Sequence, residues 1–220
     1  MMKKAAIFDL DGTVSNTLEA LAYCGNRALA EFSLSPIEQE HYKVLVGDGA
    51  YTLIERAVKE HGSDDKELID KVYKKYREIF AVDCLYNAHP YDGIPELVEN
   101  LRKAGLKTAV FSNKPHEEAI RTIDGIGLSG KFDIILGLKE GFKKKPAPDG
   151  ALLIAKEFGV EPSECLYLGD TNTDMKTGKS AGMFTIGVLW GFRDRKELEE
   201  NHADAIISHP SQAMAYIADT

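Results

Sequence analysis

From residue 94 to residue 218, short apolar runs alternate with segments of helical period. The apolar runs are those of strands buried on both faces, and they lie at Lys107–Phe111, Phe132–Leu136, Cys165–Leu168, Thr185–Leu189 and Ala205–Ile207. The helical segments lie between and after them, near 94–104, 115–124, 148–158, 172–181, 194–200 and 210–218. This alternation predicts a parallel sheet with helices on both faces.

A further strand of the same sheet is predicted at the N-terminus, where the apolar run Ala5–Phe8 is stopped by an Asp-Leu-Asp-Gly turn. From about Ser15 to Cys84 nothing resembles a strand, and residues 65–80 carry one apolar stripe at three- and four-residue steps. This helical block is therefore an insertion after the first strand. We expect an α/β fold, a Rossmann-like doubly wound parallel sheet core with an inserted α-helical cap domain. The expected core is 1–14 and 86–220, and the expected cap is 15–85.

Charge and cysteine content limit the partners and the compartment. The 220 residues carry 27 basic and 35 acidic side chains, a formal net charge of −8. Nucleic acids and anionic membranes attract basic faces, so we expect neither as a partner, whereas a small phosphate ester needs only a local cluster of cations. No apolar run approaches the roughly 20 residues of a membrane span, and the three cysteines form no CxxC pair. We expect a soluble cytoplasmic protein, monomer or homodimer.

The candidate site is formed by residues that follow the predicted strands, because ligands of such a sheet bind beyond the carboxyl ends of its strands. These residues are Asp9, Asp11, Gly12 and Thr13 after the first strand, Ser112, Asn113 and Lys114 after the second, Lys145 in the loop after the third, and Asp170 and Asp174 after the fourth. Four carboxylates at one edge repel one another unless a divalent cation joins them. Oxygen ligands favour a hard ion, with Mg²⁺ first.

In this order the motifs resemble those of a known family. Asp-x-Asp-Gly-Thr from Asp9, a strand ending in Ser112, Lys-Pro-x-Pro from Lys145 and Gly-Asp-x-x-x-Asp around Asp170 are similar to the motifs of the haloacid dehalogenase superfamily of aspartate-nucleophile phosphatases. The helical insertion resembles its type-one cap, and the resemblance covers essentially the whole chain. Within the superfamily, the greatest similarity is to bacterial phosphoglycolate phosphatases, carried by the segments 45–57, 89–94, 113–115 and 144–149.

The resemblance implies catalytic roles for three of these side chains. Asp9 is the expected nucleophile, which forms an aspartyl-phosphate. Asp11 is the expected general acid and then general base, a role that requires a protonated side chain and a raised pKa when substrate arrives. Lys145, chosen over its neighbour Lys144 because Pro146 and Pro148 fix its place, is expected to neutralise Asp9 and the transferring phosphoryl group.

Binding roles complete the expected site. Ser112, the fourth expected catalytic residue, and the backbone amide of Asn113 are expected to bind phosphoryl oxygens. The substrate-binding set is completed by Gly12, Thr13 and Lys114. The Mg²⁺ ion is expected between the Asp9 carboxylate, the Asp11 carbonyl and Asp170, with Asp174 acting directly or through water.

The substrate tail points to one residue of the cap. A C2 acid phosphate such as 2-phosphoglycolate would direct a carboxylate at the cap, and a guanidinium suits a carboxylate best. Arg56 is the candidate, because residues 47–49 mark a flexible loop and the next helix opens beside it. The structural alternative is a surface ion pair of Arg56 with Glu60, four residues on.

Several functions stay open at this point. Dehalogenases of the superfamily lack the second Asp of the first motif, and phosphosugar mutases carry a cap histidine that residues 18–26 do not contain. Residues 14–17 are somewhat like those of cytosolic pyrophosphatases. A pyrophosphatase or a sugar-phosphate phosphatase is therefore the alternative, and a non-catalytic phospho-ligand binding module on the same fold is the more distant one.

Overall fold

The computed structural model describes residues 2–218 and divides into two compact units. We call the residues up to Asn16 together with those from Pro90 onward the core, and Thr17–His89 the cap. The expected boundaries fell after residues 14 and 85, two and four residues earlier. The chain leaves the core through β2 (Ser15–Asn16) and re-enters it through β3 (His89–Pro90), which form a two-stranded sheet. Strand β2 was not predicted, because two residues are too few to show a period.

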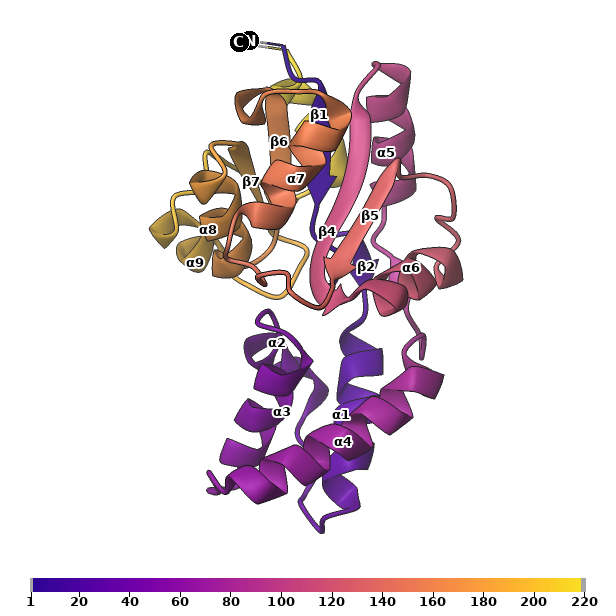
Figure 1. Ribbon diagram of the computed structural model, residues 1–220, viewed down its shortest axis with the longest axis vertical. Helices are drawn as coiled ribbons and strands as arrows, with labels where there is room; N and C mark the ends of the chain where they lie inside the picture. Colours follow the sequence, from indigo (N-terminus) through magenta and orange to yellow (C-terminus); the bar gives the residue numbers. More distant parts are fainter. Residues whose placement is uncertain (1, 219–220) are drawn as a thin grey trace. The chain divides into compact units, whose positions relative to one another are not determined.

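The core is built on a six-stranded parallel sheet (Figure 1). Its strands lie in the order β5-β4-β1-β6-β7-β8, and their bounds are Ala5–Phe8 (β1), Lys107–Pro115 (β4), Ile134–Leu138 (β5), Cys165–Gly169 (β6), Phe184–Val188 (β7) and Ala205–Ile207 (β8). Strand β1 is central, with Ile7 in register with Ala109 of β4 and Tyr167 of β6. The chain builds outward from β1 in both directions, which confirms the doubly wound core.

Helices flank this sheet: α5 (Ile94–Lys103), α6 (His116–Gly125), α7 (Asp149–Phe158), α8 (Asn172–Ser180) and α9 (Arg195–Glu200). Right-handed crossovers that run in opposite directions from β1 place α5 and α6 on one face, and α7 and α8 on the other. Figure 1 shows α7 crossing in front of the sheet. On that face Ile7, Phe111, Ile154 and Tyr167 belong to one buried apolar cluster, which fixes the strand ends that carry the polar residues.

In the core, one strand begins later than predicted and one helix is of another type. Strand β5 begins at Ile134 and not at Phe132, and the Phe132 ring packs edge-on against Phe8, with ring centroids 5.9 Å apart. The helix predicted at 210–218 is a 3₁₀ helix, η3 (Pro210–Tyr216), which His209 caps by accepting a hydrogen bond from the Ser211 amide. A second short 3₁₀ helix, η2 (Pro162–Glu164), precedes β6.

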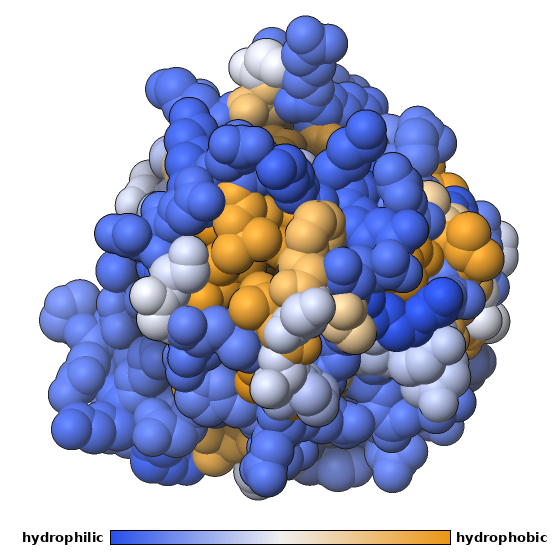
Figure 2. Space-filling model, turned by 90° about the horizontal axis from the view of Figure 1, so that it is seen from below, coloured by the Kyte–Doolittle hydropathy of each residue, from blue (hydrophilic) through white to orange (hydrophobic). Residues whose placement is uncertain are grey.

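The cap is helical, with α1 (Leu18–Ala30), η1 (Gln39–His41), α2 (Tyr42–Leu45), α3 (Ala50–Lys59) and α4 (Lys66–Asp83). Its interior contains the fully buried Leu29, Ile54 and Tyr42. Tyr42 donates to Asn26 Oδ1 at 2.9 Å and packs so closely on α1 that a Cβ at Gly25 would lie 2.4 Å from its hydroxyl oxygen. Figure 2 shows a mostly hydrophilic face with a group of apolar side chains near its centre and smaller groups toward its edges.

Between residues 2 and 218, no helix has both the length and the apolar character needed to cross a membrane.

Candidate active site

Three carboxylates meet at the carboxyl edge of the sheet. Asp9 follows β1 and Asp170 follows β6, and because Asp9 N–H donates to Leu168 O at 2.9 Å the two acids leave neighbouring strands side by side. Asp174 lies in the first turn of α8. All three are buried, and one carboxylate oxygen from each lies within 4.8 Å of the others. The structure thus brings together three of the four acids that the strand ends indicated.

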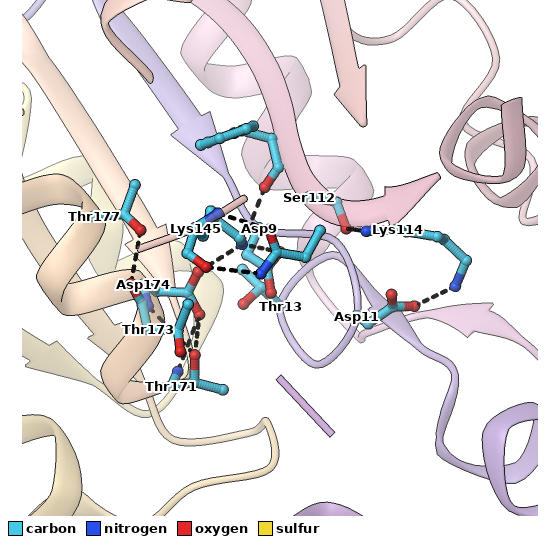
Figure 3. A network of polar contacts seen from close by, with 12 residues as sticks. Asp9, Asp11, Thr13, Ser112, Lys114, Lys145, Thr171, Thr173, Asp174 and Thr177 are labelled. Atoms are coloured by element: carbon cyan, nitrogen blue, oxygen red, sulfur yellow. Dashed lines mark hydrogen bonds and ion pairs between the residues drawn. The ribbon is translucent and has the colours of Figure 1, made fainter. Parts of the chain in front are cut away.

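Lys145 lies inside this acidic group (Figure 3). Its Nζ donates to Asp9 Oδ1 at 2.6 Å, to Asp174 Oδ1 at 2.8 Å and to the Phe111 carbonyl at 3.2 Å. The side chain is only 3% exposed. The neighbouring Lys144 is exposed on the surface. Of the lysines in this loop, Lys145 is therefore the one that reaches the carboxylates.

Asn113 fixes the backbone of Lys145. The Asn113 side chain accepts a hydrogen bond from Lys145 N–H at 2.7 Å and donates one to the Lys145 carbonyl at 3.2 Å. This paired contact joins the end of β4 to the loop after β5. The sequence indicated a role for the backbone amide of Asn113 but did not reveal this role of its side chain.

The electrostatics of the group suit a divalent cation. Three carboxylates face one ammonium, so full ionisation leaves two negative charges in a buried place. Burial and the charge of Asp174 raise the pKa of Asp9 well above its usual value, although Lys145 opposes the rise. Burial and Asp174 likewise raise the pKa of Asp170, to about 7. Burial lowers the pKa of Lys145, but the charges of Asp174 and Asp9 together raise it by more. The pKa of Lys145 therefore lies well above its usual value. The donor set of buried carboxylate oxygens fits Mg²⁺, which prefers oxygen ligands.

The Asp170 carboxylate is held from both sides. Oδ1 accepts from the Thr13 hydroxyl at 3.0 Å, and Oδ2 accepts from the Phe192 amide at 2.8 Å. Glycines leave the room that it occupies: a Cβ at Gly12 would lie 2.3 Å from Asp170 Oδ2, and a Cβ at Gly191 would lie 2.3 Å from Asp170 Cβ. Gly12 also has a positive φ of 93°, which favours glycine. Thr13, which we expected to bind substrate, thus orients Asp170.

The loop after β7 supports the same group and was missed from the sequence. Besides Phe192, it contains Trp190, whose indole Nε1 donates to the Thr13 carbonyl at 3.0 Å. The sequence did contain a sign of this loop. It follows a predicted strand and lies at the same edge of the sheet as the four loops that supply the other site residues. The rule that identified Asp9 and Asp170 applies equally to residues 190–192.

Asp174 is held by the start of its own helix. Its Oδ2 accepts from the Thr171 amide at 3.1 Å and from the Thr171 hydroxyl at 2.7 Å, while Thr171 caps α8 in return. Its other oxygen binds Lys145. The capping box therefore orients the carboxylate toward the lysine.

The structure places the fourth acid, Asp11, in a second polar group. Figure 3 shows its carboxylate turned away from Asp9 and toward Lys114, and Lys114 Nζ lies 2.8 Å from Asp11 Oδ1. Ser112 Oγ accepts a hydrogen bond from the Lys114 amide at 3.0 Å. Ser112 and Lys114 were predicted to follow β4, but they lie within its last residues. Strand β4 continues to Pro115 through an irregularity in its pairing with β5.

Arg56 lies on α3 of the cap. Its guanidinium donates to the Leu45 carbonyl at 3.0 Å and pairs with Asp48 at 2.5 Å, so it joins both ends of the turn between α2 and α3. The alternative partner Glu60 instead lies 3.1 Å from His41. The ion pair of Arg56 with Glu60, the alternative to a substrate-binding role, is therefore wrong in its partner.

Comparison with known proteins identifies the family. The model of the haloacid dehalogenase-like hydrolases matches residues 6–188. A phosphoglycolate phosphatase of Aquifex aeolicus is 33% identical, over 96% of this chain and 95% of the relative. An N-acetylmuramic acid 6-phosphate phosphatase of Pseudomonas aeruginosa is 28% identical, over 97% and 94%. The crystal structure of a candidate phosphoglycolate phosphatase from Lactobacillus delbrueckii subsp. bulgaricus superposes with a TM-score of 0.94, at 31% identity, and covers 100% of both chains.

The chain belongs to the haloacid dehalogenase-like hydrolases. This confirms the family that the order of the four motifs indicated.

Proposed function

We propose that this protein is a Mg²⁺-dependent phosphatase of small phosphate monoesters, that it forms an aspartyl-phosphate on Asp9, and that it works in the cytoplasm. The observation that carries the proposal is the buried group of Asp9, Lys145, Asp170 and Asp174 at the carboxyl edge of the sheet. Family membership supports it, as do relatives named as phosphatases of small phosphate esters.

The proposed reaction has two steps. A carboxylate oxygen of Asp9 attacks the phosphorus, the ester P–O bond breaks, and Asp11 gives a proton to the leaving oxygen. In the second step Asp11 takes a proton from a water molecule that attacks the same phosphorus, and the bond to Asp9 breaks to release inorganic phosphate. Lys145, 2.6 Å from Asp9, orients the nucleophile and offsets charge on the phosphoryl group. Ser112 and the Asn113 amide are the proposed donors to phosphoryl oxygens.

Asp9, Asp170 and Asp174 are the proposed side-chain ligands of Mg²⁺, together with the Asp11 carbonyl. When bound, the cation would supply compensation for the negative charge of the phosphoryl group. Binding can be followed without turnover, because Trp190 is the single tryptophan of the chain and donates to Thr13, which in turn donates to Asp170. We expect Mg²⁺ to change Trp190 fluorescence in the wild type. Asp170→Asn should abolish the response, and Asp174→Asn should weaken it.

We propose 2-phosphoglycolate as the first substrate to test, with Arg56 as the group that reads its carboxylate. The named activity of the Aquifex aeolicus relative supports this choice. Because Arg56 pairs with Asp48, a substrate carboxylate would compete with Asp48. Arg56→Ala should raise KM for 2-phosphoglycolate and leave a neutral aryl phosphate nearly unchanged. Equal loss on both substrates would assign Arg56 a structural role in the turn.

A sugar-phosphate phosphatase is the second candidate, because the Pseudomonas aeruginosa relative is named for a sugar phosphate. One panel decides between the candidates: 2-phosphoglycolate, a sugar 6-phosphate, pyrophosphate and a chromogenic aryl phosphate, each with Mg²⁺ and after exhaustive chelation. The preferred substrate is the one with the highest kcat/KM. Turnover of none of them would leave the binding module as the better account, and full activity after chelation would refute the metal requirement.

A further inference from the structure

Asp11 and Lys114 form a partly buried pair that connects two segments of the core. They are 103 residues apart, and Lys114 Nζ lies 2.8 Å from Asp11 Oδ1. The lysine side chain is 3% exposed, and the Asp11 side chain is 22% exposed. An ammonium with so little access to water needs an anion beside it, and Asp11 provides one.

Strand β4 holds Lys114 in place. The amide of Lys114 donates to Ser112 Oγ at 3.0 Å, within the stretch where the pairing of β4 with β5 is irregular before Pro115 pairs with Leu138. Asp11, in contrast, lies in the turn after β1, and its carboxylate is the more exposed of the pair. The better anchored partner is therefore the lysine.

The direction of the Asp11 side chain follows from this contact. Figure 3 shows the carboxylate pointing toward Lys114, and not into the group formed by Asp9, Lys145 and Asp174. The Asp11 side chain is 22% exposed, so water can reach it, and a carboxylate open to water is well solvated without a partner. The Lys114 ammonium thus holds the Asp11 carboxylate in this direction.

We propose that Lys114 is a positioning residue for Asp11, and not primarily a substrate ligand. It holds the carboxylate at one place in the turn after β1, two residues along the chain from the nucleophile, so that the carboxyl reaches the leaving oxygen and then the attacking water without a search through solvent-facing rotamers. This inference rests on the proposed function, since it assigns Lys114 to the acid–base step.

The test is a double-mutant cycle of Lys114→Met and Asp11→Asn, with Lys114→Arg as the conservative variant. Each protein is assayed with Mg²⁺ on 2-phosphoglycolate and on an aryl phosphate whose leaving group needs no proton. Formation of the phosphoenzyme from the aryl phosphate is measured by rapid quench. Lys144→Met, in the same loop as Lys145 but exposed, is the control for loss of a lysine charge.

If Lys114 acts through Asp11, Lys114→Met lowers kcat on 2-phosphoglycolate at least about tenfold, a part of the ~10²–10⁴ that general acid–base catalysis supplies. KM and the rate of phosphoenzyme formation from the aryl phosphate stay nearly constant, and Lys114→Arg recovers part of kcat. In the Asp11→Asn background, Lys114→Met has no further effect. An equal loss in that background, or a raised KM with unchanged kcat, would overturn the inference and make Lys114 a substrate ligand.

The pair can also be tested without turnover. The same four proteins are unfolded in urea, and we expect the shifts in midpoint to be non-additive, because either substitution breaks the same contact. Additive shifts would overturn the inference. If the wild type hydrolyses neither ester, the proposed function fails on its own, and the urea cycle still decides whether Lys114 and Asp11 are coupled.

Discussion

Replacing Lys145 by methionine should make the free energy of unfolding of the core depend strongly on divalent cations. Methionine keeps an unbranched side chain of similar length, so the substitution removes the ammonium and leaves little cavity. Asp9 and Asp174 then lose the donor that lies 2.6 Å and 2.8 Å from their oxygens. All three side chains are less than one tenth exposed, so water cannot replace the lost charge.

The expected cost follows from that geometry. Removing one partner of a buried ion pair costs about 3–5 kcal/mol, because the remaining charge is left unpaired. The group in Lys145→Met carries one more negative charge and should bind Mg²⁺ more tightly than the wild type does. At about 100 times its dissociation constant, a ligand that binds only the folded state adds ~2.7 kcal/mol. Magnesium should therefore restore a large part of the stability lost in the variant.

The assay is urea unfolding of wild type, Lys145→Met and Lys144→Met, each with chelator and with Mg²⁺. The exposed Lys144 is the matched control, and its replacement should change the free energy of unfolding by less than about 0.5 kcal/mol. A Lys145→Met variant that unfolds at the wild-type urea concentration would show that Lys145 does not stabilise the buried carboxylates, and the prediction would be refuted. It is equally refuted if Mg²⁺ stabilises the variant and the wild type by the same amount.

Three further substitutions test the packing and charge of the core by urea unfolding. Gly178→Ala should destabilise by about 1–3 kcal/mol, because its Cβ would lie 2.4 Å from Thr185 Cγ2; a gain would show that α8 has room. The fully buried Tyr167 side chain lies close to Lys145, and its hydroxyl completes no hydrogen bond of ordinary geometry among residues 2–218, so Tyr167→Phe should keep or raise stability by up to about 1 kcal/mol, and a clear loss would show that the hydroxyl is bonded. Burial raises the pKa of Asp204, but the hydrogen bonds from Lys179 and Thr185 together lower it by more. The pKa of Asp204 therefore lies below its usual value. Its contribution is therefore full above about pH 4 and lost as pH falls through the lowered pKa, so the deficit of Asp204→Asn should shrink below that pH, and a constant deficit would contradict the assignment.

The periodic elements and the residues at strand ends could be predicted from the sequence. Apolar runs locate the strands of a parallel sheet, and such a sheet brings its carboxyl ends to one edge. Asp9 and Asp170 follow that rule directly, and Lys145 was favoured by the prolines beside it. In the structure, Lys145 Nζ lies 2.6 Å from Asp9 Oδ1, and a carboxylate oxygen of Asp9 lies within 4.8 Å of one of Asp170.

What could not be predicted depends on contacts between side chains and distant segments. Asn113 holds the backbone of Lys145, 32 residues away, and Lys114 turns Asp11 away from Asp9. Helical spacing favoured Glu60 as the partner of Arg56, but the turn between α2 and α3 presents Asp48. No periodicity carries such information, because it arises only when loops from separate parts of the chain are packed together.

Chemical trapping of the phosphoenzyme shows directly whether Asp9 is the nucleophile. Asp11→Asn should form the aspartyl-phosphate and release it slowly, so the protein is mixed with an aryl phosphate and Mg²⁺, quenched in acid, digested and analysed by mass spectrometry. We expect one added phosphoryl group on the peptide that contains Asp9. We expect none when Asp9→Asn is introduced as well or when Mg²⁺ is removed. A phosphoryl group on another residue, or rapid turnover by Asp9→Asn with no trapped species, would contradict it.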